Sequence, residues 1–272
     1  MVKHLFLLVS FVSCIYSATV TSAIKDVLGS REFNSKKKFI EIIFKDKDSY
    51  KDEDSLNYPK ILQKLRDEGL LKLSNVSSPL RVAFTTNSEN NQIFIKVVKD
   101  TLFSLGFSNI NTIKAVKRGK KFIWVVSLGN NYMLDPLLFA KAMKEKNISI
   151  KGLKRYSLTN WNYVLDVKDA VIIPKKLEYN DIIKLQKSLR AYWLNIEGAK
   201  KVQIQSSLNN SWHPYVVLYN KDLKIISTVK KNRKTSKLDI NIPSDAMYLK
   251  IDDLYTIKNI RDGLDILIQK RE

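Results

Sequence analysis

A chain of 272 residues, 44% of them hydrophobic, has ample material for buried cores, which excludes an intrinsically disordered protein. The formal net charge of +20 permits an anionic partner, such as nucleic acid, an acidic membrane surface or an anionic glycan, but it indicates one only if the lysines cluster on one face, since the abundance of Lys, Ile and Asn also fits an AT-rich genome. One cysteine and two histidines argue against a disulfide framework and against a metal centre built from these side chains.

The first residues have the order of a secretory signal peptide. Lys3 is followed by an apolar stretch, Leu5 to Val12, and then by small residues. The apolar stretch is shorter than the roughly 20 residues that a membrane-spanning helix needs. We therefore expect residues 1–17 to be a cleaved signal peptide, and the mature protein to be periplasmic with no transmembrane segment. Export argues against nucleic acid as the partner.

Cleavage is expected after Ser17, with Ala18 and Ala23 as alternative positions. It removes Cys14, the only cysteine, together with His4. The alternative for Cys14 is a lipid anchor, because Phe11-Val12-Ser13-Cys14 faintly resembles the lipobox of bacterial lipoproteins. In either case the mature chain can form no internal disulfide and must be stabilised by its cores.

Residues 18–78 are expected to lead into the fold with one strand and one helix. Ala18 to Lys38 has weak patterning and predicts an arm or a short helix. Lys38 to Phe44 is rich in branched and aromatic residues and predicts a strand. Tyr58 to Glu68 has apolar residues on one helical face and predicts a helix.

Residues 79–168 predict a ferredoxin-like α+β domain. Its elements are a strand from Arg81, a helix ending near Leu105, a hairpin of Lys114–Lys117 and Phe122–Leu128, a helix opened by Asp135-Pro136, and an extended stretch, Ile148–Asp166. This is the order of the split ferredoxin-like unit, in which two helices cover one face of a four-stranded antiparallel sheet.

Residues 191–272 predict an antiparallel β-sandwich of jelly-roll type, after a linker, 169–190, that contains a short helix at Asn180–Lys187. Eight short strands between turn residues are expected: Ala191–Ile196, Lys201–Gln205, Tyr215–Tyr219, Lys224–Val229, Lys237–Ile242, Tyr248–Ile251, Tyr255–Lys258 and Leu264–Gln269. The fold class of the whole chain is therefore α+β.

The expected mature chain lacks the residues that most kinds of catalysis require. His213 is its only histidine, no Gly-x-Ser-x-Gly segment occurs, and the glycines form no Gly-x-Gly pair. We therefore expect no metal, no cofactor and no enzyme activity. The alternative is a carbohydrate-active hydrolase with two carboxylates, from Asp252, Asp253 or Glu197. Neighbouring strand residues face opposite ways, so Asp252 and Asp253 fit a turn better.

Aromatic and basic residues indicate a ligand-binding function in place of catalysis. Trp212 lies in a turn-like segment and is expected to present an exposed ring with His213 and Tyr215, although aromatic residues also fill cores. Two basic clusters fit anionic glycan, lipid or protein contacts, although many charge runs are only solvated surface. They are Lys230, Lys231, Arg233 and Lys234 near the aromatic segment, and Lys114, Lys117, Arg118, Lys120 and Lys121 in the predicted hairpin.

Some of these segments resemble known families. Tyr192-Trp193-Leu194-Asn195-Ile196, Ser211-Trp212-His213-Pro214-Tyr215 and Tyr219-Asn220 resemble discoidin-type and carbohydrate-binding jelly rolls. The element order of residues 81–167 is similar to wall-binding SPOR domains, without their short motifs. Glu145-Lys146-Asn147-Ile148-Ser149 matches the sequon of bacterial N-glycosylation and predicts a glycan on Asn147. With its Lys, Asn and Ile bias, the chain looks like a periplasmic protein of Campylobacter-type (epsilonproteobacterial) bacteria.

Together these features predict a non-enzymatic exported protein of the envelope. As a scaffold or accessory factor, it is expected to bind an envelope protein, or an anionic glycan such as peptidoglycan. The alternatives are the hydrolase with paired carboxylates and an assembly factor for the flagellum or another surface machine.

Overall fold

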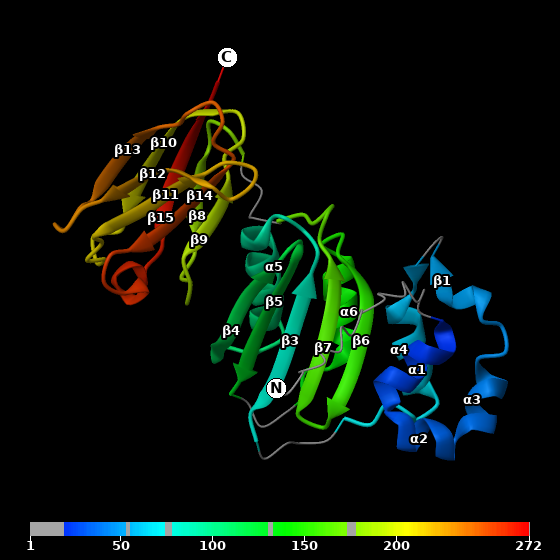
Figure 1. Cartoon of the computed structure of the whole chain (residues 1–272). Helices are drawn as coiled ribbons and strands as arrows, with labels where there is room; N and C mark the ends of the chain where they lie inside the picture. The colour runs from blue at the N-terminus through cyan, green and yellow to red at the C-terminus, as the bar shows by residue number, and fades with distance from the viewer. Residues whose placement is uncertain (1–18, 53–54, 74–77, 130–132, 173–177, 272) are drawn as a thin grey trace, which may run out of the picture. The chain divides into compact units, whose positions relative to one another are not determined.

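The computed structural model describes residues 19–52, 55–73, 78–129, 133–172 and 178–271 (Figure 1). The predicted signal peptide and Cys14 lie outside these ranges. The chain forms two compact units: one comprises the residues up to Asn87 together with Thr101–Asp166, the other Ser88–Asp100 and the residues from Val167 onward. The described part of the chain is α+β, and none of its helices is long and apolar enough to cross a membrane.

Helix α1 (Val20–Leu28) opens the first unit with a capping box. The Thr19 hydroxyl accepts a hydrogen bond from the Ser22 backbone N–H, and the Ser22 hydroxyl oxygen accepts one from the Thr19 N–H. The helix buries Val20, Ala23, Ile24, Val27 and Leu28. The arm or short helix expected here is therefore an integral helix of the first unit.

The predicted strand at Lys38–Phe44 is wrong, because these residues form helix α3 (Lys37–Ile43) after helix α2 (Ser30–Ser35). A short apolar run fits a strand and a helix equally well on periodicity. Here Ile40 and Phe44, four residues apart, face the core, while Phe39 and Ile42 are exposed.

A short hairpin and helix α4 complete this helical layer. The 3-10 turn η1 (Asp48–Tyr50) leads into strands β1 (Lys51–Asp52) and β2 (Ser55–Leu56), which pair with each other. Helix α4 (Tyr58–Asp67) follows, so the helix predicted at Tyr58–Glu68 is confirmed.

A five-stranded sheet in the order β4-β5-β3-β7-β6 forms the centre of the first unit. Helix α6 lies behind one face of this sheet (Figure 1). The elements are β3 (Leu80–Thr86), β4 (Ile110–Arg118), β5 (Lys121–Leu128), α6 (Pro136–Lys144), β6 (Ser149–Ser157) and β7 (Asn160–Asp166). Helix α5 (Asn91–Ser104) is divided between the units, because its residues up to Asp100 belong to the second. The predicted hairpin is β4–β5, and Asp135 caps α6 as expected.

The ferredoxin-like arrangement with four antiparallel strands is not confirmed. The stretch Ile148–Asp166, predicted as a single extended segment, forms the hairpin of β6 and β7. Strand β7 then pairs in parallel with β3, which gives five strands and one parallel pair. A single strand of 19 residues would overrun partners of seven to nine residues, so the chain folds back at Leu158-Thr159.

The second unit contains two four-stranded sheets in which every strand pair is antiparallel. The sheet orders are β13-β10-β15-β8 and β12-β11-β14-β9. The strands are β8 (Ile182–Leu185), β9 (Tyr192–Asn195), β10 (Ala199–Ser206), β11 (Pro214–Tyr219), β12 (Ile225–Lys230), β13 (Lys237–Asn241), β14 (Tyr248–Asp253) and β15 (Leu264–Lys270). Side chains from both sheets share one apolar core, as in a β-sandwich.

Two elements of the sandwich differ from the sequence expectation. The helix expected at Asn180–Lys187 is strand β8, which pairs with β15. The strand expected at Tyr255–Lys258 is a turn followed by the 3-10 helix η2 (Ile257–Ile260). In the first case, pairing with β15 determines the structure of a short segment whose pattern is ambiguous. In the second, the backbone N–H groups of Tyr255 and Thr256 donate to the Asp253 carboxylate, which stabilises a turn in place of a strand.

Candidate functional site: the loop end of the sandwich

Four loops meet at one end of the sandwich, and we call this surface the loop end. The loops are residues 186–191, 207–213, 231–236 and 254–263, and the opposite end carries the loops 196–198, 220–224 and 242–247. Backbone hydrogen bonds join three of the four: Ser211 N–H to Asn259 O at 2.9 Å, Thr235 N–H to Trp212 O at 2.9 Å and Leu254 N–H to His213 O at 2.8 Å. The loop end is therefore a connected surface.

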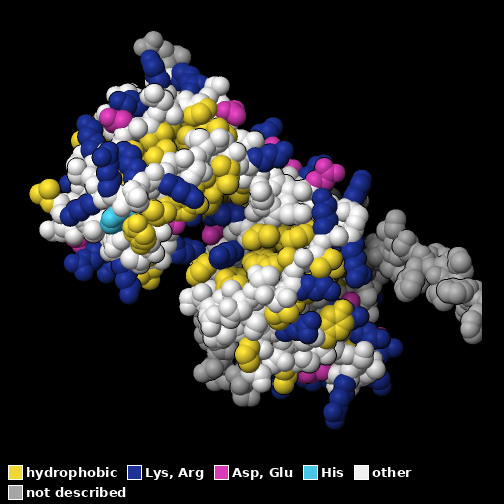
Figure 2. All heavy atoms as spheres, turned by 60° about the vertical axis from the view of Figure 1, so that its left-hand side comes forward, with side chains coloured by type: hydrophobic (Ala, Val, Ile, Leu, Met, Phe, Trp, Pro, Cys, Tyr) yellow, Lys and Arg dark blue, Asp and Glu magenta, His cyan; other side chains and the backbone are white. Residues whose placement is uncertain are grey.

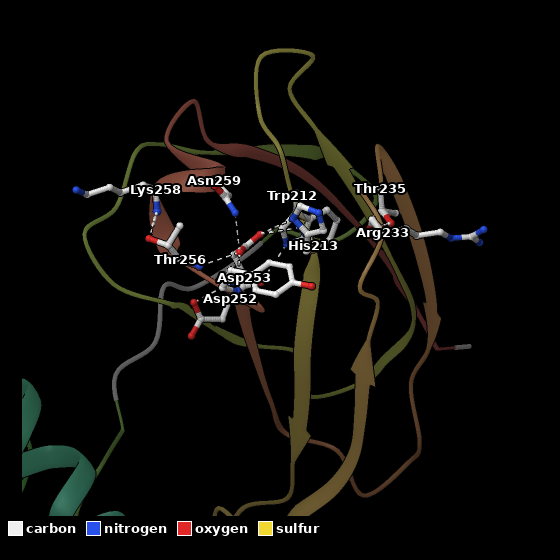
Figure 3. Close-up of polar contacts among 10 residues, drawn as sticks. Trp212, His213, Arg233, Thr235, Asp252, Asp253, Thr256, Lys258 and Asn259 are labelled. Carbon is white, nitrogen blue, oxygen red and sulfur yellow. Dashed lines mark hydrogen bonds and ion pairs between the residues drawn. The ribbon is translucent and has the colours of Figure 1, made fainter.

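The buried carboxylate of Asp253 organises this end (Figure 3). One oxygen accepts a hydrogen bond from the His213 backbone N–H at 2.7 Å. The other accepts from the N–H groups of Tyr255 and Thr256, each at 2.9 Å, and from the Asn259 amide at 3.0 Å. Hydrogen bonds to an ionised acceptor are stronger than neutral ones, so Asp253 fixes two loops.

Asn210 performs a similar role beside it. Its side-chain amide donates to the backbone oxygen of Gly263 at 2.7 Å and its side-chain oxygen accepts from the Asp262 N–H at 3.0 Å. Gly263 has a φ of +79°, and a Cβ there would lie 2.2 Å from the backbone oxygen of Leu185. Only glycine fits this close approach, which holds the loop 254–263 against the end of β8.

The expected exposed ring of Trp212 is wrong. Its side chain is fully buried in the sandwich core, and its indole N–H donates to the backbone oxygen of Asp252 at 3.0 Å. The inward alternation of Pro214, Val216 and Leu218 in β11 extends back two residues to Trp212. Extending this period of two along the sequence would have placed Trp212 inside.

His213 and Tyr215 lie on the outer side, in the opposite phase to Trp212. The His213 ring meets the ring of Tyr255 edge-on, with centroids 4.9 Å apart. Its Nδ1 atom is buried without a hydrogen-bond partner and lies 3.8 Å from a carboxylate oxygen of Asp253. Unlike Trp212, Tyr255 is largely exposed, so it presents the aromatic surface at this end.

Two lysines flank the half-buried ring of Tyr215. The ammonium of Lys230 lies 5.0 Å from the ring centroid and that of Lys250 lies 5.3 Å from it. Lys250 also pairs with Asp252 at 3.0 Å. Sequence reasoning missed Lys250, because its place beside Tyr215 depends on the pairing of β11 with β14, which no local pattern reveals.

Charge is distributed unequally between the two ends. The four loops of the loop end hold seven cationic residues and one exposed acid, Asp262: the cations are Lys187, Arg190, Lys231, Arg233, Lys234, Lys258 and Arg261. The three opposite loops hold Lys221 and Lys224 against Glu197, Asp222 and Asp245. Of the seven cations, Arg190 lies 3.6 Å from Asp100 of the same compact unit.

The cationic side chains project into solvent. In Figure 3, Arg233 and Lys258 point outward on opposite sides of the Asp253 cluster. On the face shown in Figure 2, Lys and Arg side chains are spread over the sandwich with few Asp or Glu side chains among them. The predicted residues Lys230, Lys231, Arg233 and Lys234 thus belong to one edge of the site, where β12 runs into the loop 231–236.

The remaining predicted sites lie in the first unit. The cations of the β4–β5 hairpin, Lys114, Lys117, Arg118, Lys120 and Lys121, are all exposed around a turn at Gly119. Because β4 is an edge strand, its lysines also protect the sheet from pairing with another chain. Asn147 is exposed in the turn after α6, with a φ of +56°.

The three acids considered for hydrolysis form no pair. Asp253 is buried and saturated with N–H donors, Asp252 faces outward against Lys250, and Glu197 lies at the opposite end of the sandwich. In the described ranges, no cluster of three or more His, Cys, Asp or Glu side chains is arranged to hold a metal ion.

Comparison of the sequence with protein-family models gives no match, and comparison with curated proteins finds no similar sequence. Function must therefore be inferred from the residues of the loop end.

The Asp253 cluster predicts a large stability difference between two neighbouring substitutions. Asp253→Asn replaces a carboxylate oxygen with an amide that faces N–H donors, so we expect the free energy of unfolding to fall by about 2–4 kcal/mol. Asp252→Asn removes the partly exposed ion pair with Lys250 and leaves an oxygen that can still accept from the Asp253 N–H, so it should cost about 1 kcal/mol or less. Urea denaturation followed by tryptophan fluorescence measures both, and equal losses would contradict the structural role of Asp253.

Proposed function

We propose that this chain is a non-enzymatic exported protein of the bacterial envelope, and that its sandwich binds an anionic envelope component through the loop end. The strand order supports the jelly-roll expectation. The first, eighth, third and sixth strands form one sheet, and the second, seventh, fourth and fifth form the other. Lectin domains use this architecture, but the fold alone does not assign a function.

The observation that carries the proposal is the excess of cations at the loop end. A surface with several unbalanced positive charges attracts anions and raises their local concentration, and the effect weakens as salt increases. The Asp253 and Asn210 networks hold the loops 207–213 and 254–263 in place, so these two loops lose little conformational entropy when a ligand binds. Acidic sugars and phosphate-bearing lipids both offer the negative groups that this surface favours.

Carboxylate hydrolysis has less support. Retaining and inverting glycosidases require two acids on the two sides of one scissile bond. Asp252 and Asp253 face opposite sides of β14, and Asp253 is committed to the backbone of its own turn. The aromatic surface at the loop end comes from Tyr255 and Tyr215, neither of which faces a carboxylate pair.

Removing cations from the loop end should weaken binding to polyanions. We expect the triple variant Lys231→Ala, Arg233→Ala, Lys234→Ala to lose at least about tenfold in retention on isolated cell-wall sacculi and on an anionic polysaccharide resin at low salt. All three side chains are half-exposed or exposed, so the fold should be retained.

The matched control removes the same charge from the first unit, with Lys117→Ala, Arg118→Ala and Lys120→Ala in the β4–β5 hairpin. This control should bind like the unmodified protein. If the hairpin variant loses retention and the loop-end variant keeps it, the loop end is the wrong surface.

Export itself makes a prediction about the mature amino terminus. Cleavage after Ser17 leaves the cap of α1 intact, whereas cleavage after Ala23 would delete Val20 and Ala23, which are buried. We therefore expect amino-terminal sequencing of the periplasmic protein to begin at Ala18. A first residue of Ile24, or retention of the uncleaved segment, would contradict this.

A further inference from the structure

The loop end also exposes three large apolar side chains. Leu208 is 90% exposed and Leu189 is 85% exposed, the two highest values among the large hydrophobic residues of the described ranges, and Tyr255 is 64% exposed. They come from three different loops, 207–213, 186–191 and 254–263. Exposed apolar residues are ordinary when they are scattered, but these three gather at one end of one sandwich.

These three side chains are not part of the sandwich core. Its buried cluster is complete with residues from both sheets, and none of the three belongs to it. The loops that carry Leu208 and Tyr255 are fixed at their bases by Asn210 and Asp253. The tips that carry Leu208 and Tyr255 are therefore held outward by a fixed frame, at the same end of the sandwich as the cations already described.

We propose that the loop end docks on an anionic phospholipid surface, with Leu189, Leu208 and Tyr255 entering the headgroup layer and the surrounding cations contacting lipid phosphates. This rests on the proposed anion-binding function and names its ligand. Membrane-surface binding increases with buried apolar area and with attraction between basic residues and anionic lipids, and the loop end supplies both. Tyrosine suits the interface because its ring is apolar and its hydroxyl remains hydrated.

A glycan accounts for fewer of these features. The cations alone would suffice to bind sugar carboxylates or sulfates, and the flanked ring of Tyr215 could stack on a sugar. Two leucines that project into solvent from separate loops gain nothing from a hydrated polysaccharide. In a lipid interface, each leucine leaves water for a partly apolar layer.

The leucines can be tested without touching a cation or the fold. The chain from Ala18 to the carboxyl terminus, carrying Leu189→Ser and Leu208→Ser, is compared with the unmodified chain for binding to vesicles of phosphatidylglycerol and phosphatidylcholine. We expect at least a tenfold loss of vesicle binding and no change in retention on the anionic polysaccharide resin. Ile42→Ser with Ile182→Ser is the matched control, since both are 68% exposed and neither lies in the loop end.

A second measurement follows insertion directly. The chain from Ala18 contains no cysteine, so Leu208→Cys provides a single attachment point for an environment-sensitive dye. Its emission should shift to the blue with phosphatidylglycerol vesicles and stay unchanged with phosphatidylcholine alone.

The outcomes separate the two proposals. Vesicle binding that survives the leucine substitutions, or an unshifted dye, overturns membrane docking while the anion-binding function stands on the polyanion retention. If the loop-end charge variant still binds both the resin and the vesicles, both proposals fail.

Discussion

The buried carboxylate of Asp253 is the constraint on which the loop end depends. Placed at the last position of β14, it accepts hydrogen bonds from the backbone N–H groups of His213, Tyr255 and Thr256 and from the side-chain amide of Asn259. Burying a charge is unfavourable unless it is well hydrogen-bonded, and here the donors come from two loops. Asp253, which the sequence offers as a candidate catalytic acid, therefore determines the shape of the proposed binding surface.

This arrangement separates the residues that stabilise the sandwich from those proposed to contact a partner. Trp212 and the inner faces of the two sheets supply the apolar core, and the Asp253 and Asn210 networks connect that core to the loops. The side chains left for a partner are the exposed cations and apolar tips, which make few contacts with the fold. Substituting them should change binding far more than folding, since surface positions away from structural features tolerate change.

Much of the architecture follows from local patterns in the sequence. The helices at Tyr58 and Asp135 have caps or a proline in the first turn, and most of the sandwich strands are bounded by turn residues, so their positions could be predicted. The secondary-structure predictions are wrong where tertiary contacts determine whether a segment is a helix or a strand. Helix α3 and strand β8 are short apolar segments that periodicity cannot assign.

Only part of the candidate site can be predicted from the sequence. Composition and turn residues indicate its basic cluster, His213 and Tyr215, whereas the expectation of an exposed Trp212 is wrong because the inward alternation of β11 extends to this residue. The contributions of Lys250 and Leu189 depend on strand pairing and on which loops share an end, and both arise only when distant segments meet.

The central claim is that the loop end is the surface that meets the partner. Hydrogen–deuterium exchange of the full mature chain, measured with and without phosphatidylglycerol-containing vesicles, tests it most directly. We predict slower exchange confined to residues 186–191, 207–213, 231–236 and 254–263. Protection at the β4–β5 hairpin or at α3, with these four loops unchanged, would contradict it.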